Sequence, residues 1–153
     1  MKIRSDFVTN SSSSSFILAF NSEEEIDEFK NKLPQYWKEE ILDSIVADIK
    51  EGLITKEEAV EYFKRNISTW SLRYKGKDVW KYSWQKLENE KSDVYKFVKK
   101  YKDGKVKEFI EKIKEFNVFS KVEYSDNDGE LSSNLEHEIM PYTSHTVESF
   151  SHH

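Results

Sequence analysis

Five apolar residues in a row, Phe16-Ile17-Leu18-Ala19-Phe20, directly follow a run of five serines and constrain the fold more than any other segment of the chain. The apolar run is too short for a helix, and its aromatic and branched side chains are typical of strands. Because no position in it is polar, both faces of such a strand have to be covered. The sequence therefore predicts a buried strand at residues 16–20.

The serine run before this strand consists of Ser11, Ser12, Ser13, Ser14 and Ser15. Its composition is typical of a flexible or loosely packed connector. Its backbone N–H groups and hydroxyls could instead face an anion, although a tight anion-binding loop normally uses glycine, which this run lacks. Since the run leads directly into the predicted strand, it must reach the sheet at a defined point.

Helical periodicity dominates the segment that follows the strand. Ser22 with Glu25, and Thr55 with Glu58, match the capping box that opens a helix. The spacing of apolar residues predicts three helices in this part of the chain. The second of them runs from about residue 35 to residue 51, and we expect Gly52 to close it in the left-handed conformation.

The middle of the chain mixes two patterns. Apolar residues between positions 67 and 84 alternate partly at period two around Gly76, which predicts a strand or hairpin. From about Lys86 to Ile113 the pattern is helical again, and Asp103-Gly104 predicts an interruption that divides it into two helices.

The last third of the chain predicts strands. Val118 to Tyr124 alternate as one strand, Asp128-Gly129 is typical of a hairpin turn, and residues 131–139 are expected to form the return strand. Residues 146–153 predict one more strand. The expected fold is therefore a single α+β domain over residues 1–153, with a small mixed or antiparallel sheet covered by four to five helices. The sheet combines the N-terminal strand with this C-terminal hairpin.

The opening of the chain, K-x-R-x-x-F-V-x-N-S-S-S-S-S-F over residues 2–16, resembles that of many small uncharacterised bacterial and phage proteins. The resemblance covers about the first 20 residues and implies no known activity. It implies, by association only, an origin in a mobile element.

Composition limits the chemistry that the chain can carry. There is no cysteine, so disulfides, thiolate metal sites and a cysteine nucleophile are excluded, as is common in the cytoplasm, where we expect this protein to reside. Only 4 glycines are present, and no phosphate-binding or dinucleotide-binding loop pattern occurs. No apolar run approaches the length of a membrane span, so no membrane association is expected.

All four histidines lie near the end of the chain, at His137, His145, His152 and His153. Imidazole is a common ligand of zinc and other divalent metals, so a site formed by His137 with His152 or His153, assisted by His145, is one hypothesis. The alternative is structural, because His137 would share a strand face with core leucines as a hydrogen-bonded histidine. The helical zinc motif H-E-x-x-H does not fit, since Pro141 occupies the second histidine position.

Charge is distributed unevenly along the chain. Residues 64–121 carry 17 Lys/Arg against 8 Asp/Glu, whereas the remainder carries 7 against 21. Basic and aromatic residues interleave in the middle, a mixture that can neutralise phosphates and stack on bases. The candidate nucleic-acid-binding residues are Arg73, Lys75, Trp80, Lys81 and Trp84. The alternative is an ordinary solvated lysine face with tryptophans in the core.

The best functional hypothesis from the sequence is a non-enzymatic protein-binding or adaptor role with an unidentified protein partner. The metal site is the first alternative, serving structure or a hydrolytic reaction, and nucleic-acid binding through residues 73–84 is the second.

Overall fold

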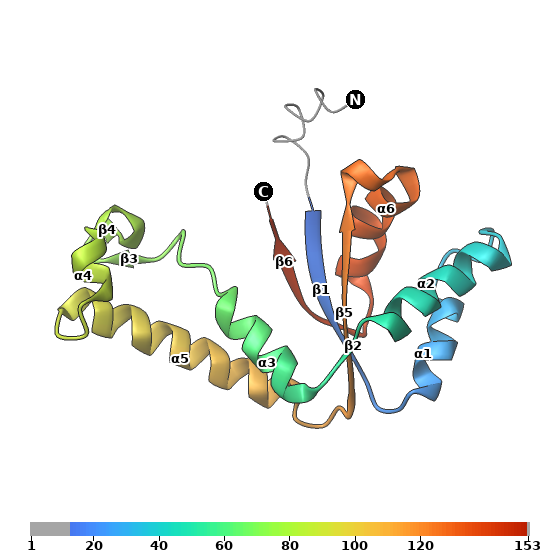
Figure 1. The fold of residues 1–153 in the computed structure, drawn as a ribbon, viewed down its shortest axis with the longest axis horizontal. Coiled ribbons are helices and arrows are strands. Elements are labelled where there is room, and N and C mark those ends of the chain that lie inside the picture. The colour runs from blue at the N-terminus through green and yellow to red at the C-terminus, as the bar shows by residue number, and fades with distance from the viewer. Residues whose placement is uncertain (1–12, 153) are drawn as a thin grey trace. The chain divides into compact units, whose positions relative to one another are not determined.

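The computed structural model describes residues 13–152, so Ser11, Ser12 and His153 lie outside the described residues. The chain forms two compact units. Figure 1 shows the chain coloured from blue at the N-terminus to red at the C-terminus. Unit 1 contains residues 13–59 and 113–152 of the described chain, and unit 2 contains residues 60–112. The single domain expected over residues 1–153 stays a prediction.

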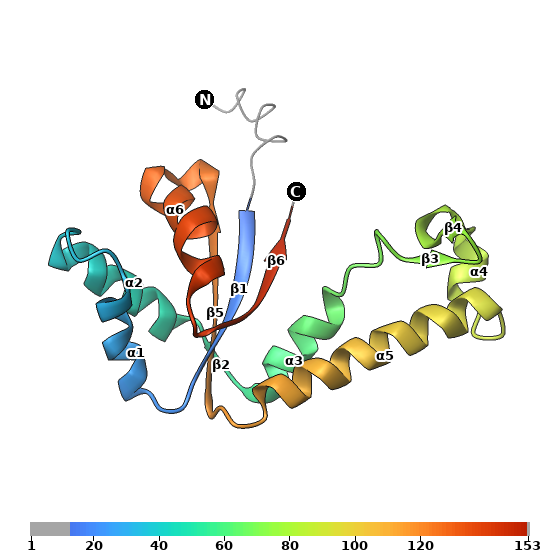
Figure 2. The same cartoon turned by 180° about the vertical axis from the view of Figure 1, so that it is seen from behind.

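Unit 1 is built on a four-stranded antiparallel sheet with the strand order β2-β5-β1-β6 (Figures 1 and 2). Its strands are β1 (Ser13–Phe20), β2 (Leu53–Ile54), β5 (Val118–Ser125) and β6 (Thr146–Ser151). β1 is paired along both edges, with Phe16 opposite Val122 of β5 and Ser149 of β6. The predicted strand is confirmed, because all five residues of the apolar run are buried. It begins three residues earlier than expected, within the serine run.

Side chains of β1 alternate between the two faces of the sheet. Phe16, Leu18 and Phe20 enter the main hydrophobic core, which also holds buried side chains from the neighbouring helices and from β5. By the same alternation Ser14 lies on this core face, whereas Ser15 lies on the opposite face with Ile17. Ser14 and Ser15 therefore lie on opposite faces of the sheet.

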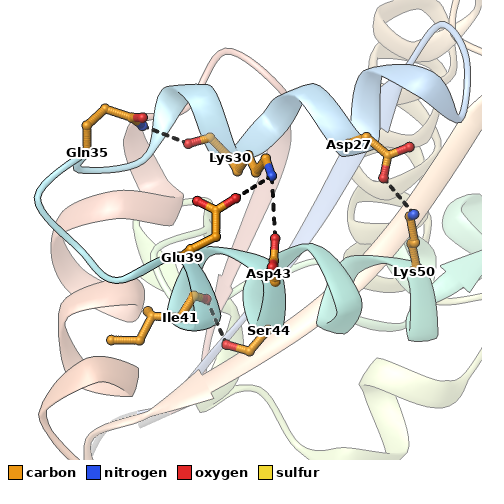
Figure 3. Close-up of polar contacts among 8 residues, drawn as sticks. All are labelled: Asp27, Lys30, Gln35, Glu39, Ile41, Asp43, Ser44 and Lys50. Atoms are coloured by element: carbon orange, nitrogen blue, oxygen red, sulfur yellow. Dashed lines mark hydrogen bonds and ion pairs between the residues drawn. The ribbon is translucent and has the colours of Figure 1, made fainter.

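Two helices follow β1 and contribute to the core. They are α1 (Glu24–Glu28), continued by a 3-10 turn (Phe29–Lys32), and α2 (Glu39–Glu51). Figure 3 shows the polar contacts between them: Lys30 lies 2.8 Å from Glu39 and 3.5 Å from Asp43, and Lys50 lies 2.6 Å from Asp27. The hydrogen bond that the Lys30 ammonium donates to the Glu39 carboxylate raises the pKa of Lys30. Because these ion pairs are exposed, they contribute little to the stability of the fold. The two helices are held together by their apolar faces, which pack in the hydrophobic core.

The helix boundaries correct part of the sequence prediction. The capping box at Ser22 is wrong, because Glu25 instead accepts hydrogen bonds from the backbone and side-chain amides of Asn21. The second helix begins at residue 39 and not at residue 35. The other capping box is confirmed: Thr55 and Glu58 exchange both hydrogen bonds, at 2.9 and 3.0 Å, at the start of α3 (Lys56–Arg65).

Gly52 is required for a different reason from the one its position suggests. Its φ is −92°, so the predicted left-handed cap is wrong. A Cβ at this position would lie 2.2 Å from the carbonyl oxygen of Lys121 in β5. The backbone N–H of Lys121 donates to the Gly52 carbonyl at 2.9 Å, and the buried Ser120 hydroxyl donates to the Ile49 carbonyl at 2.6 Å. Glycine therefore permits the close approach of β5 to the end of α2.

The segment after β5 is helical, so the predicted return strand over residues 131–139 is wrong. A 3-10 turn (Asp126–Asp128) leads into α6 (Glu130–Asn134), a π-helical turn (Leu135–Ile139) and a second 3-10 turn (Met140–Tyr142). Gly129, with φ of 108°, joins the first turn to α6. Leu135 and Met140 are both buried in the core at the five-residue spacing of a π turn. The antiparallel sheet is completed by β6, the extra strand predicted after Pro141.

Unit 2 contains the end of α3, a small hairpin and two further helices. These elements are β3 (Arg73–Tyr74), β4 (Lys77–Asp78), a 3-10 turn (Val79–Lys81), α4 (Trp84–Glu88) and α5 (Asp93–Ile113), whose last residue belongs to unit 1. The hairpin around Gly76 is confirmed. The interruption at Asp103-Gly104 is wrong, since α5 is continuous. Among residues 13–152, no helix combines the length and the apolar character needed to cross a membrane.

The different surroundings of two glycines give a matched test of the fold. We expect Gly52→Ala to lower the free energy of unfolding by about 1–3 kcal/mol, because the new methyl group overlaps a backbone carbonyl that cannot retreat without breaking the sheet. We expect Gly104→Ala to raise the stability of α5 by about 0.5–1 kcal/mol, because no atom lies near its Cβ and alanine favours a helix.

Urea unfolding followed by circular dichroism measures both changes. Unchanged stability of the Gly52→Ala variant would contradict the close approach of β5, and a loss of stability in Gly104→Ala would contradict the continuous helix.

Candidate functional site

A polar cluster lies at the start of β1 on the core face of the sheet. We name Ser14, Asp126, Ser133, Glu136 and His137 the Ser14 cluster. His137 Nε2 lies 2.8 Å from Oδ1 of Asp126 and 3.2 Å from Oε1 of Glu136. Ligand atoms of these three side chains all lie within 4.8 Å of one another, so they form a group that can hold a metal ion.

Burial distinguishes Glu136 from the other members of the Ser14 cluster. Its side chain is 0% exposed, against 36% for Asp126 and 49% for His137. A buried carboxylate is costly unless its charge is compensated. The cluster therefore combines one fully buried carboxyl group with two side chains that are open to solvent.

Glu136 lies in the π-helical turn. The amide of Met140 donates to the carbonyl of Leu135, five residues back, so the turn holds one more residue than an α-helical turn. Within this turn the consecutive residues Leu135 and Glu136 are both buried, whereas His137 lies at the surface. Turns of this kind occur frequently at functional sites.

Two serine hydroxyls orient the carboxylates of the cluster. Ser14 donates to Oε2 of Glu136 at 2.9 Å, which leaves Oε1 facing His137. Ser133 donates to Oδ1 of Asp126 at 3.1 Å. Hydrogen bonds that fix the direction of potential metal ligands are a regular feature of metal sites.

A second polar group lies on the opposite face of the same strand. We name Ser15, Glu123 and His152 the Ser15 cluster. The Ser15 hydroxyl donates to Oε2 of Glu123 at 3.0 Å, and His152 Nε2 lies 3.0 Å from the same hydroxyl oxygen. Glu123 is directly opposite Ser15 in the register of β5, and the His152 amide donates to the Ser13 carbonyl beside it.

The hydrogen-bond partners of Ser15 argue against nucleophilic catalysis by this residue. A hydroxyl has a single proton, and Ser15 gives it to Glu123, so His152 Nε2 must donate to the serine oxygen. A nucleophilic serine requires the reverse, a histidine that accepts the serine proton. Ser15 is also 0% exposed. The cluster therefore links β1 to Glu123 of β5 on one side and to His152, the residue after β6, on the other.

The structure does not bring together the three predicted histidine ligands that it describes. His137 belongs to the Ser14 cluster and His152 to the Ser15 cluster, on opposite faces of the sheet. His145 lies near the other end of β1, where its Nδ1 is 3.1 Å from the Ala19 carbonyl oxygen and its ring stacks on Phe20 at 4.5 Å. Ala19 is five residues from Ser14, or about 17 Å along the strand. His153 lies outside the described residues.

The basic aromatic segment forms the hairpin of unit 2. Lys75 and Gly76 have φ values of 51° and 78°, and positive φ at both central residues is the mark of a type I′ turn. The hairpin packs on α5 through Tyr74, whose ring lies 4.9 Å from that of Phe97. The hydroxyl of Tyr82 donates to the Tyr74 carbonyl at 3.0 Å.

The hairpin presents a stacked pair of tryptophans. The amide of Val79 donates to the Leu72 carbonyl at 2.9 Å, which brings the residues flanking the hairpin together. The rings of Trp70 and Trp80 are 5.1 Å apart and inclined by only 7°, yet they are 69% and 48% exposed. Trp84, which opens α4, is also exposed. These three tryptophans are therefore at the surface and not in the core.

One cation lies over a ring of this pair, and another lies nearby through a shared acidic partner. Lys81 Nζ lies 5.3 Å from the centre of the Trp80 ring, within cation–π range. Asp78 pairs with Arg73 at 3.4 Å and with Lys81 at 3.6 Å. The predicted residues Arg73, Trp80 and Lys81 thus share one small region, with Lys75 at the turn of the same hairpin.

Sequence reasoning missed most of the Ser14 cluster. The sequence predicts a turn at Asp128-Gly129 and a strand over residues 131–139, an arrangement that gives no role to Asp126 or Glu136. Leu131, Leu135 and Ile139 recur every four residues, which is a helical spacing and was the available signal. A helical interpretation places Glu136, the residue before His137, near the core.

Comparisons with protein-family models, curated proteins and solved structures find no match for this chain. The resemblance of its opening to bacterial and phage proteins therefore stays a prediction.

The two serines give a test in which the more buried residue is expected to matter less. We expect Ser14→Ala to cost about 1.5–3 kcal/mol in the free energy of unfolding, because it removes a donor from the fully buried Glu136 carboxylate. Ser15→Ala should cost about 0.5–1.5 kcal/mol, because Glu123 and His152 are exposed and can turn to water.

Chemical denaturation of both variants in metal-free buffer measures the difference. A larger loss for Ser15→Ala would contradict the importance assigned to the buried carboxylate.

Proposed function

We propose that this protein binds one divalent transition-metal ion through Asp126, Glu136 and His137. The observation that carries the proposal is the fully buried Glu136 carboxylate, which faces a second carboxylate and an imidazole at the surface. A divalent cation would compensate the charge of both carboxylates at once. The other two side chains, Asp126 and His137, are open to solvent.

The spacing of the ligand atoms supports the proposal. Two atoms bonded to one ion at about 2.1 Å lie about 3.0–3.4 Å apart at octahedral or tetrahedral angles. His137 Nε2 is 2.8 Å from Oδ1 of Asp126 and 3.2 Å from Oε1 of Glu136, which is close to this range. His137 Nε2 has to release its proton, because a ligating nitrogen must present a lone pair.

The ligand types favour zinc or manganese over calcium and magnesium. Imidazole suits transition metals, whereas calcium and magnesium select oxygen ligands alone. Two carboxylates and one imidazole leave room for one or more water molecules on the exposed side of an ion.

The proposed role of the ion is structural. Asp126 lies in the turn after β5, and Glu136 with His137 lies in the π-helical turn. Glu136 in turn receives the hydrogen bond from Ser14 of β1. A bound ion would therefore tie the helical segment to the sheet, as suits the non-enzymatic binding protein expected from the sequence. Its protein partner stays a prediction.

Titration calorimetry with ZnCl₂ and MnCl₂ tests the proposal, using the full chain freed of any histidine tag. We expect about one equivalent of bound metal. Glu136→Gln should lower the affinity at least about tenfold, because it keeps the shape of the side chain but removes a charged ligand. Glu138→Gln is the matched control, since this neighbouring carboxylate is exposed and outside the cluster.

His152→Ala separates the proposed ligand set from one that includes the C-terminal histidines. We expect this variant to bind metal as the unmodified chain does. Metal content below about a tenth of an equivalent, or equal losses in Glu136→Gln and Glu138→Gln, would contradict the proposal.

Metal binding should also stabilise the fold and depend on pH. At a free-ion concentration of 100 times the Kd, the gain is about 2.7 kcal/mol, or a Tm increase of about 5–10 °C for a chain of this size. The increase should shrink as pH falls from 7.5 to 5.5, because protons compete with the ion for His137. Differential scanning calorimetry measures it, and a Tm insensitive to metal at pH 7.5 would count against the structural role.

A further inference from the structure

Charge separates between the two structural units. Residues 60–112 carry 15 Lys/Arg against 8 Asp/Glu, a net charge of +7, whereas the rest of the chain carries 9 against 21, a net charge of −12. The hairpin with the stacked tryptophans belongs to the basic unit. Unit 2 thus combines a positive field with exposed aromatic rings, and the metal centre has no part in it.

Exposed tryptophans of this kind call for a ligand with flat faces. Tryptophan buries more apolar area than other side chains when it is covered, so leaving two rings in water forgoes a large stabilisation. Trp70 is the more exposed member of the pair. Its open ring face can receive another aromatic ring in the same parallel arrangement that it makes with Trp80.

We propose that unit 2 binds single-stranded nucleic acid, with a base stacked on Trp70 and the adjacent phosphates held by Arg73, Lys75 and Lys81. Charge complementarity selects an anionic polymer, and the stacked rings select one whose bases are unpaired. A duplex offers phosphates but keeps its base faces covered, so it should bind more weakly. An acidic peptide offers negative charge without aromatic bases, so it should compete poorly.

Asp78 sets the strength of the proposed contact. It forms ion pairs with both Arg73 and Lys81, and so partly neutralises two of the three side chains proposed to hold phosphates. Asp78→Asn removes this negative charge while keeping the size of the side chain. The variant should therefore bind nucleic acid more tightly, a result that misfolding could not produce.

Fluorescence anisotropy with a labelled 20-nucleotide single-stranded DNA tests the proposal on the full chain. We expect binding at 50 mM NaCl that weakens strongly at 200 mM, as for contacts that release counterions. Trp70→Ala should weaken binding roughly 5- to 150-fold through the loss of one stacked base, and Trp70→Phe should restore part of it. Lys75→Glu combined with Lys81→Glu should also reduce the slope of affinity against salt.

Matched controls lie in unit 1. Tyr36→Ala removes an aromatic side chain that is 85% exposed, and Lys32→Glu reverses an exposed charge. Both should leave binding unchanged, as should Glu136→Gln, because the proposal does not rest on the metal centre. Circular dichroism of each variant shows whether it is folded.

Three results would overturn the proposal. The first is no binding at 50 mM NaCl. The second is equal affinity of the folded Trp70→Ala variant and the unmodified chain, which would mean charge attraction without stacking. The third is equal competition by duplex DNA or by polyglutamate, which would point to a general anion surface or to an acidic protein partner.

Discussion

The pairing of β1 with a strand on each of its edges is the constraint on which unit 1 depends. β5 follows one edge over all eight residues of β1, and β6 follows the other with one irregularity near Leu18. A central strand needs packing partners on both faces and hydrogen-bond partners along both edges. The five apolar residues of β1 are buried and so meet the first requirement. The end of α2 approaches β5, the neighbour of β1, at Gly52. The helical segment after β5 packs in the same hydrophobic core as β1.

The polar start of β1 follows from the same constraint. Alternation sends Ser14 to the core face and Ser15 to the opposite face, where each meets an acidic side chain. The consequences differ because burial differs: Glu123 can be solvated, whereas the Glu136 side chain is enclosed beside His137. The same strand thus contributes a structural contact on one face and an orienting hydroxyl to the proposed metal centre on the other.

The sequence predicted those features that depend on local patterns. The apolar run gave the central strand, Thr55 and Glu58 gave a helix start, and the residues around Gly76 gave the hairpin. It failed where tertiary packing decides: Leu131, Leu135 and Ile139 suit a strand face or a helix equally well until their neighbours are known. For the same reason the sequence identifies His137 as a ligand candidate but not Asp126 and Glu136, which lie beside it because residues 126–139 fold as helical turns. Exposure of the tryptophans was equally beyond local patterns, because the sequence does not say which aromatic residues lack a covering neighbour.

The most direct measurement is a crystal structure of the protein soaked in zinc, with diffraction recorded on both sides of the zinc absorption edge. The account predicts one strong anomalous peak about 2.1 Å from His137 Nε2 and from carboxylate oxygens of Asp126 and Glu136, with Ser14 still donating to Glu136. A zinc peak at His152 or His145 with none between Asp126, Glu136 and His137 would contradict it.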